Sequence, residues 1–494
     1  MNYLSIIKQI TGKKKLPYVE DDGIVNDYLN WYKGKTAWHS YNVYNGKNFI
    51  KCERFSLNMA KRVCEDWASL LINEKTDIVL KTKQSQEKLY DILEDCKFWK
   101  KANKGIEKAF ALGGGAFVLS VDDLIFDDEG NLIADENNSP KINVTFVDRT
   151  KIIPITIKDE MITECAFVNV YNDHTYVSIH LLDESGNYVI HNITASGSGS
   201  RLNYDADNPS NYYIFDTKNN IPWFVIVHPN IVNNVDIESP FGISIYANAI
   251  DILKEVDIVF DSYANEFLLG KKRIFISSKN MAIDPETGEF IRVFDSNDTV
   301  YYVLPEADDG KLVINNDTQP LRVNDHNIGM QQVLNLLSYS CGFGTNHYKF
   351  DQGGVSTATQ IISENSDMLR NLKRHEIVIE EALIDLTKAI LYASTTFTNI
   401  KFNANDIDDV EIKFDDSIVE DKVAEKADDR LDVQMGVMSP AEYRSKWYAE
   451  DIAVAEAKIA EMDKYSIVDD EPDQDANDAT EDTTDGQDEE NDEV

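Results

Sequence analysis

The sequence predicts an α+β fold, and three observations carry this prediction. Apolar residues recur at helical spacing in long segments near both ends of the chain. A block at 141–231 alternates short apolar runs with turn residues, which is typical of β-strands, and a β-rich insert at 271–323 separates two helical segments. With 494 residues, of which 43% are hydrophobic, the chain is long enough for several cores, and its length predicts two to four domains.

The first elements expected are helices. Residues 53–72 and 86–111 carry Leu, Met, Trp and Phe on one helical face. Gly113, Gly114 and Gly115 then precede the apolar run AFVLSV, which predicts a helix end, a tight reversal and a strand. Further strands are predicted at INVTFV, IIPITI, TECAFVNVY, TYVSIHLL, YVIHNI and WFVIVH.

Residues 243–269 contain no Gly or Pro and predict one helix, about 40 Å long at ~1.5 Å per residue. One narrow stripe of this helix is polar and acidic, and consists of Asp251, Glu255, Ser262 and Glu266. The opposite face is apolar, with Leu253, Val256, Phe260, Tyr263 and Phe267. Gly270 is a candidate C-cap, and the basic cluster Lys271, Lys272 and Arg273 follows it.

The β-rich insert is expected to hold strands at RIFIS, FIRVF, TVYYVL and KLVIN, with a turn at DPETGE. Asn324 or Asp325 can cap a second helix, which ends near 342–344. The longest helix is predicted at roughly 357–394, a strand at 410–414, and a helix at 417–435 that ends at Gly436. Ser439-Pro440-Ala441-Glu442 predicts a capping box at the start of the last helix.

No enzyme signature is found. The stretch D-Q-G-G-V-S-T-A-T-Q at 351–360 lacks the lysine and the second glycine of a nucleotide-binding loop, and is better read as a capping box formed by Thr357 and Gln360. The glycines at 113–115 follow a helix and precede a strand, which is the wrong order for a dinucleotide site. Neither H-E-x-x-H nor G-x-S-x-G occurs, so no metal, cofactor or catalytic residue is predicted.

Composition limits the partners and the compartment. The net charge is −39, and 14 acids without any Lys or Arg lie in 469–494, which leaves −25 on the rest. Such a chain is not expected to grip duplex DNA by broad phosphate neutralisation, and the acidic end is expected to be disordered. Five cysteines without C-x-x-C spacing indicate a reducing cytosol. No apolar run approaches the roughly 18 residues of a membrane span.

Four segments in order resemble the portal proteins of tailed bacteriophages, the head–tail connectors, and in particular the type found in siphophages of Gram-positive bacteria. They are SPFGIS (239–244), GGVSTATQIISENS (353–366), VEIKFDDSIVED (410–421) and VQMGVMSPAEY (433–443). The similarity in order and spacing covers roughly residues 30–450. The resemblance rests on the four segments occurring together and in this order.

The resemblance implies a portal-type subunit in a ring, usually of twelve copies. It divides the chain into a wing (1–238, and the long helix and strand at 357–414), stem helices (239–269 and 324–342), a β-rich clip (270–323), a tunnel loop (343–356), a helical crown (415–468) and an acidic tail (469–494). The ring would occupy one vertex of the capsid in the virion, after assembly in the host cytoplasm.

The resemblance also implies partners. Double-stranded DNA passes through the channel, the terminase large subunit docks during packaging, and head-completion and tail proteins bind later; scaffold and major capsid proteins surround the ring. ATP hydrolysis belongs to the terminase, in agreement with the missing nucleotide motif.

The resemblance also implies which residues line the channel and which form the docking surface. The tunnel loop, taken as the channel's narrowest part, contributes Phe343, Asn346, His347, Tyr348, Lys349, Gly353 and Gly354. Asp251, Glu255 and Glu266 would keep DNA from sticking if they face the channel. Lys271, Lys272 and Arg273 start the clip, a candidate docking surface.

One departure and two alternatives remain open. Where the family pattern often has lysine before Thr-Ala-Thr and glutamate after it, this chain has Ser356 and Gln360, which leaves Lys349 as the loop's only lysine or arginine. The chain could instead be another structural virion protein, a minor capsid protein or adaptor without a DNA channel, or an ATP-driven packaging enzyme.

Overall fold

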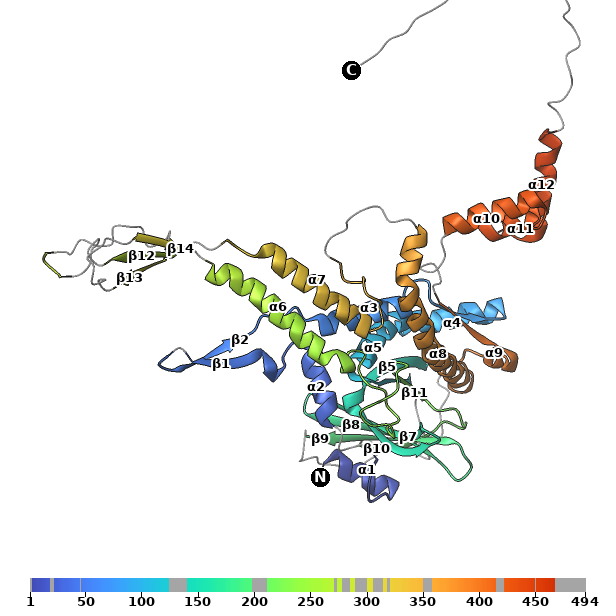
Figure 1. Cartoon of the computed structure of the whole chain (residues 1–494). Coiled ribbons are helices and arrows are strands. Elements are labelled where there is room, and N and C mark those ends of the chain that lie inside the picture. Colours follow the sequence, from blue (N-terminus) through green and yellow to red (C-terminus); the bar gives the residue numbers. More distant parts are fainter. Residues whose placement is uncertain are drawn as a thin grey trace, which may run out of the picture. The chain divides into compact units, whose positions relative to one another are not determined.

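The structure mixes helices and strands, as predicted (Figure 1). It is a computed structural model that describes residues 2–17, 22–44, 46–123, 140–197, 211–270, 273–277, 285–288, 300–304, 314–317, 320–349, 358–414, 422–448 and 450–466. The chain divides into two compact units, residues 1–419 and 420–494.

The larger unit contains most of the elements. Its helices are α1 (Tyr3–Thr11), α2 (Asp22–Tyr32), α3 (Met59–Leu71), α4 (Lys83–Asp95), α5 (Phe98–Leu112), α6 (Ile250–Leu269), α7 (Val323–Ser340), α8 (Ala358–Phe397) and α9 (Ala404–Asp408). Its strands are β1 (Ser40–Tyr44), β2 (Phe49–Glu53), β3 (Asp77–Leu80), β4 (Gly115–Asp122), β5 (Lys141–Asp148), β6 (Ile152–Lys158), β7 (Met161–Tyr171), β8 (His174–Leu182), β9 (Tyr188–Ser196), β10 (Tyr212–Asp216), β11 (Phe224–Val227), β12 (Arg273–Ser277), β13 (Val300–Leu304), β14 (Ile314–Asp317) and β15 (Val410–Lys413).

The strands of the described residues form five sheets. An antiparallel sheet has the order β10-β9-β8-β7-β6, and α1 buries Ile6 and Ile7 against its apolar face. A second sheet has the order β11-β4-β5, β3 pairs with β15, and β1 and β2 form an isolated hairpin. In the insert, β12 pairs in parallel with β13 and antiparallel with β14. The predicted strand FIRVF lies outside the described residues.

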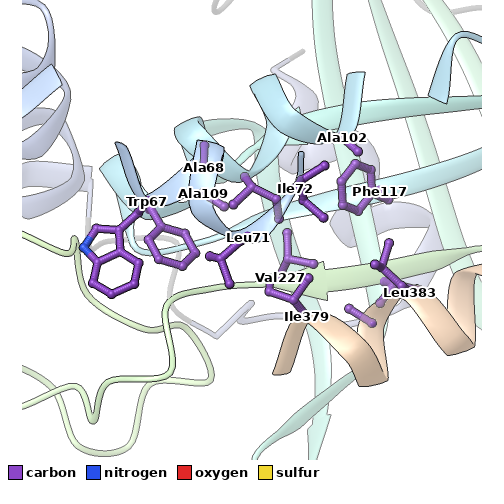
Figure 2. Packing of buried hydrophobic residues seen from close by; sticks show 14 of the residues in the cluster. Trp67, Ala68, Leu71, Ile72, Ala102, Ala109, Phe117, Val227, Ile379 and Leu383 are labelled. Carbon is purple, nitrogen blue, oxygen red and sulfur yellow. The ribbon is translucent and has the colours of Figure 1, made fainter. Parts of the chain in front are cut away.

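The main core joins segments that are far apart in the sequence. Trp67 and Leu71 of α3, Phe117 of β4, and Ile379 and Leu383 of α8 are all buried in one cluster. Figure 2 shows these side chains converging between the helices and the strands. The long helix α8 is therefore part of the same core as the N-terminal helices.

Glycines 113–115 permit close contacts with two other parts of the chain. Gly113 ends α5 with φ 72°, and a Cβ there would lie 2.6 Å from the carbonyl oxygen of Gly242. The guanidinium of buried Arg149 donates to that same oxygen over 2.8 Å. The helix end and reversal predicted at 113–115 are confirmed. Gly113 and Gly114 are needed because residues 241–243 lie against them, and Gly115 is needed because the ring of Phe146 does.

Three predicted helices are wrong in their extent. The helix expected at 53–72 is shorter, because β2 ends at Glu53 and α3 begins only after Asn58, which has a left-handed φ of 53°. The helix expected from residue 243 begins with a 3₁₀ turn at Ala247–Ala249 and continues as α6. Residues 243–246 are instead buried and non-helical, because the N–H of Ile245 donates to Phe110 (2.9 Å) and the Tyr246 hydroxyl donates to Tyr28 (2.7 Å). The periodic segment 86–111 is two helices, since Lys97 adopts a left-handed φ of 53° between α4 and α5.

The helix that follows the β-rich insert, α7, starts one or two residues before the predicted caps. Arg322 occupies the N-cap position, not Asn324 or Asp325, because its backbone and side chain are both bonded to Glu266 of α6. The long helix is confirmed and runs to Phe397, three residues beyond the expected end. Thr357, its predicted cap, lies outside the described residues, as does the tail at 469–494.

The smaller unit consists of α10 (Lys422–Met435), α11 (Pro440–Tyr448) and α12 (Ile452–Ser466). Gly436 follows α10 with φ 73°, as predicted. The capping box is confirmed, because the Ser439 N–H donates to the Glu442 carboxylate (2.8 Å) and the Glu442 N–H donates to the Ser439 hydroxyl (3.1 Å). The last helical segment is two helices, α11 and α12.

Candidate functional site

The loop that follows α7 begins inside the core. Phe343 is 2% exposed and is stacked between Trp67 (ring centroids 4.6 Å apart) and His347 (4.2 Å). A fully buried aromatic side chain is one of the larger single contributions to a core. Phe343, which was expected to face a channel, therefore belongs to the interior of the subunit in this structure.

Asp66 of α3 holds the next part of the loop. Its carboxylate accepts hydrogen bonds from the Tyr348 hydroxyl (3.0 Å) and from Arg62 (2.8 Å), and His347 Nε2 lies 3.5 Å away. Burial first, and then the charge of Asp66, raises the pKa of the Tyr348 phenol well above its usual value. The hydroxyl consequently stays a hydrogen-bond donor to Asp66.

Backbone groups of the loop are also bonded to the surrounding helices. Trp67 Nε1 donates to the Cys341 carbonyl (3.0 Å), and Asn371 of α8 donates to the Gly342 carbonyl (2.9 Å). Gln331 of α7 donates to the Tyr348 carbonyl (2.8 Å). Because three different helices hold residues 341–348, this half of the predicted tunnel loop has a fixed conformation relative to the core.

His375 of α8 completes the aromatic cluster. Its ring lies edge-on to Trp67, at 4.9 Å, and its Nδ1 accepts a hydrogen bond from the Asn230 N–H (3.0 Å). Burial lowers the pKa of His375 to about 3. The imidazole is neutral near pH 7 and serves as a packing and accepting group there.

The exposed part of the loop begins at Thr345. Asn346, His347 and Lys349 are exposed, whereas Tyr348 is half-buried. Gly353 and Gly354 lie outside the described residues. The structure therefore brings Phe343, His347 and Tyr348 together and leaves two residues on the surface: Asn346, within the same segment, and Lys349, directly after it. We call residues 341–348 the loop anchor.

The acidic stripe predicted on α6 is only partly found in the structure. Asp251, Glu255 and Ser262 are exposed on one face, and Ile258, which is 47% exposed, lies among them. Glu266 is instead paired with Arg322, whose guanidinium donates to its carboxylate over 2.8 Å. The hydrogen bond from the Arg322 side chain lowers the pKa of Glu266 to about 2.

The Glu266–Arg322 pair has a structural consequence. It joins the last turn of α6 to the first turn of α7, on the two sides of the insert. Of the predicted basic cluster, Arg273 lies in β12, and Lys271 and Lys272 lie outside the described residues.

Sequence reasoning missed Asp257, which is 3% exposed on α6. Its carboxylate accepts from the Leu57 N–H (2.9 Å) and the Ser56 hydroxyl (3.1 Å), and lies 2.8 Å from His39 Nε2. A signal was present, because an acid one residue after Val256, on the apolar side of a helix, predicts a buried partner. The partner could not be identified, since it lies about 200 residues away in the chain.

Two absences apply to the described part of the chain only. Within it, no group of three or more His, Cys, Asp or Glu side chains is placed to hold a metal ion. None of the helices in the same residues has the length and apolar character needed to cross a bilayer.

Comparison with known proteins gives one extensive match. The family model described as "Phage portal protein, SPP1 Gp6-like" matches residues 24–467. None of the curated proteins matches the chain. Among solved structures, a chain from "Neck of native GTA particle computed with C12 symmetry" is similar over 89% of this chain and 96% of its own, with 10% identity and a TM-score of 0.39. At that score the two chains share a distant likeness only.

A family match over nearly the whole chain decides the assignment. Portal proteins of this family form multimeric rings in the phage capsid, which holds the DNA. They are structural proteins and not enzymes. The chain therefore belongs to the SPP1 Gp6-like family of phage portal proteins, and it is a head–tail connector component of a bacteriophage capsid.

Proposed function

We propose that this protein forms the ring-shaped channel at one capsid vertex through which double-stranded DNA enters during packaging and leaves at ejection. The observation that carries the proposal is the match to the portal family over residues 24–467. Twelve copies per ring, and the boundaries of the wing, stem, clip, tunnel loop and crown, stay predictions from the family resemblance.

The loop anchor supports a role for the exposed residues within it and directly after it. A loop that must meet moving DNA needs a base that does not shift, and residues 341–348 are held by α3, α7 and α8. We therefore place Asn346, His347 and Lys349 at the channel wall, with Lys349 meeting phosphates as they pass. Phe343 and Tyr348 act as the packing that positions them.

The exposed acids of α6 suit the wall of a conduit. Asp251 and Glu255 would repel the phosphate backbone, and a channel that lets DNA slide must avoid tight phosphate contacts. Glu266 has a different role in this proposal, since its pairing with Arg322 closes the base of the clip.

The clip is the proposed docking surface. It would receive the terminase large subunit during packaging and head-completion and tail proteins afterwards, with Lys271, Lys272 and Arg273 at its start. Scaffold and major capsid proteins would contact the outside of the ring, which assembles in the host cytoplasm before it becomes part of the virion.

Electron microscopy and native mass spectrometry of the purified full-length protein test the ring. A closed ring with a central hole is expected. A monomer or an open fibre would contradict the proposal and favour another structural virion protein, such as a minor capsid protein or adaptor.

Packaging by Lys349→Ala rings and by rings shortened within 351–356 tests the channel wall. Less packaged DNA per capsid is expected at unchanged ring formation. Lys83→Ala, on the exposed first turn of α4, is the matched control. Normal packaging by both loop variants would remove the loop from the channel while leaving the ring intact.

A further inference from the structure

The hairpin formed by β1 and β2 has one face that exposes two apolar side chains, Val43 and Ile50. Its register pairs Val43 with Ile50 and Tyr41 with Cys52, so these four side chains lie on the same face. Asn42 and Lys51 pair on the other face. Val43 is 43% exposed and Ile50 is 48% exposed.

The hairpin is nevertheless fixed at its base. Asp257 binds His39 and the Leu57 N–H on the two sides of the hairpin, and Asp261, one turn later on α6, accepts from the Phe55 N–H (3.0 Å). Arg54 lies over the rings of Trp38 and Tyr41, at 4.3 and 4.1 Å. The arm therefore projects in a defined direction from α6.

An isolated two-stranded sheet is marginal in water, and an apolar face on it needs a partner. The exposed aromatic pair at the tip, Tyr44 (58%) and Phe49 (74%), with ring centroids 5.2 Å apart, lies on the other face, beside Asn42 and Lys51. Val43 and Ile50 therefore form a small apolar surface of their own, which the subunit does not use for its core.

A complementary surface lies on the opposite side of the same subunit. Glu266, which bonds to the start of α7, is nine residues after Asp257, or about two and a half helical turns, so the two side chains leave α6 on opposite flanks. Figure 1 shows α6 between α7 and the hairpin. The outer face of α7 exposes Ile328 (64%), Leu336 (52%) and Tyr339 (65%) at helical spacing.

The charges of the two surfaces are also complementary. Residues 33–54, which include the hairpin, contain five Lys or Arg and one Glu in a chain of net charge −39. α7 contains no Lys or Arg and one acid, Asp325, and α6 exposes Asp251 and Glu255, while its other three acids, Asp257, Asp261 and Glu266, are bonded within the subunit. A basic arm can therefore approach the α6–α7 side of another copy, whereas two acidic bodies would repel.

We propose that the apolar face of the β1–β2 hairpin of one copy packs on the Ile328–Leu336–Tyr339 stripe of α7 in the next copy. Two different surfaces on opposite flanks make a head-to-tail contact, which closes into a ring when it is repeated with a fixed rotation. This inference rests on the proposed ring and identifies a contact that holds neighbouring subunits together.

Carboxylates placed on the two faces of the hairpin test the proposal. In Val43→Asp and Ile50→Asp the charge would be buried at the contact, so association is expected to weaken at least about tenfold. Asn42→Asp adds the same charge to the other face of the same strand and is expected to assemble like the wild type. Native mass spectrometry measures the ring fraction, and circular dichroism checks that each variant folds.

Disulfide trapping identifies the occupant of the stripe. In a Cys52→Ser background, oxidised Val43→Cys/Leu336→Cys protein is expected to give a ladder of covalent multimers, because the two thiols lie on opposite flanks of one chain. Val43→Cys/Tyr171→Cys, with the second thiol on exposed β7, is the control and should give no ladder.

The outcomes separate the two proposals. Wild-type protein that stays monomeric would contradict the proposed ring. Wild-type rings together with intact Val43→Asp rings and no ladder would overturn the hairpin contact alone. If the hairpin variants keep rings but lose binding to duplex DNA, the arm is a DNA contact and the inference fails.

Discussion

The loop anchor and the β1–β2 hairpin are both held by an aspartate on a neighbouring helix, yet they present opposite surfaces. Asp66 fixes a segment whose aromatic residue, Phe343, is 2% exposed. Asp257 fixes a segment whose aromatic residue, Phe49, is 74% exposed. A buried aspartate therefore fixes a segment with a buried aromatic side chain in one place, and a segment with an exposed aromatic side chain in the other.

The comparison separates stability from assembly. Side chains of the loop anchor are part of the core, so changing them should alter folding of the single chain. Side chains on the hairpin contribute little to the isolated subunit, so changing them should alter association. Changes at the two aspartates themselves, Asp66 and Asp257, should alter folding of the single chain, because a buried carboxylate that loses its hydrogen-bond donors lowers stability in either place.

The largest effect is expected from truncating Trp67, the α3 side chain on which Phe343 of the loop anchor stacks. Trp67→Ala removes a fully buried ring that stacks on Phe343, and should lower the free energy of unfolding by about 3–5 kcal/mol. Phe49→Ala on the hairpin should change it by less than about 0.5 kcal/mol. Denaturant unfolding followed by circular dichroism, under conditions where the chain is monomeric, measures both. Equal losses of unfolding free energy in Trp67→Ala and Phe49→Ala would show that the loop anchor and the hairpin do not differ in their contribution to stability.

A somewhat smaller effect is expected at the base of the hairpin. Asp257→Ala leaves the Leu57 N–H and the His39 ring without their acceptor, and should cost about 2–4 kcal/mol. Asp251→Ala, on the exposed face of the same helix, is the control and should be nearly neutral. A double-mutant cycle with His39→Ala isolates the pair. An Asp257→Ala chain as stable as the control would show that this aspartate does not hold the arm.

A pH-dependent effect is expected from His375. Its pKa is lowered from 6.5 to about 3 in the folded chain, so the unfolded chain binds more protons between these values. The stabilisation is complete above pH 6.5 and is lost as the pH falls toward 3. His375→Asn keeps an acceptor for the Asn230 N–H and cannot be protonated there, so its unfolding midpoint should fall less steeply in this window. The exposed His174→Asn is the control, and identical slopes for wild type and His375→Asn would refute the assignment.

The smallest effect is expected from the hydroxyl of Tyr348. Tyr348→Phe removes the hydrogen bond to Asp66 but keeps the ring against Phe343, and should cost about 1 kcal/mol. Thermal unfolding measures this loss. Tyr44→Phe at the tip of the hairpin is the matched control: its hydroxyl donates only to the exposed Gly46 carbonyl (3.1 Å), so little change is expected. A larger loss for Tyr44→Phe would mean that the hairpin is the more constrained of the two regions.

Much of the fold could be predicted because it depends on local patterns. The long helix α8, the helices α6 and α7 and the capping box at Ser439 follow from periodicity and from short-range hydrogen bonds. The prediction failed at residues 243–246 because burial against Phe110 and Tyr28 overrides helix propensity there. It also missed the short strands of the hairpin, whose apolar face is too brief to stand out.

The sequence by itself determined the family, the α+β class and the absence of a nucleotide-binding motif, since these depend on residue identity and spacing along the chain. Only the tertiary structure decided that Phe343 is buried, that Glu266 pairs with Arg322, and that Asp257 clamps the hairpin. The reason is physical: each of these contacts joins segments that are about 56 to 280 residues apart, and local patterns carry no information about which distant groups meet.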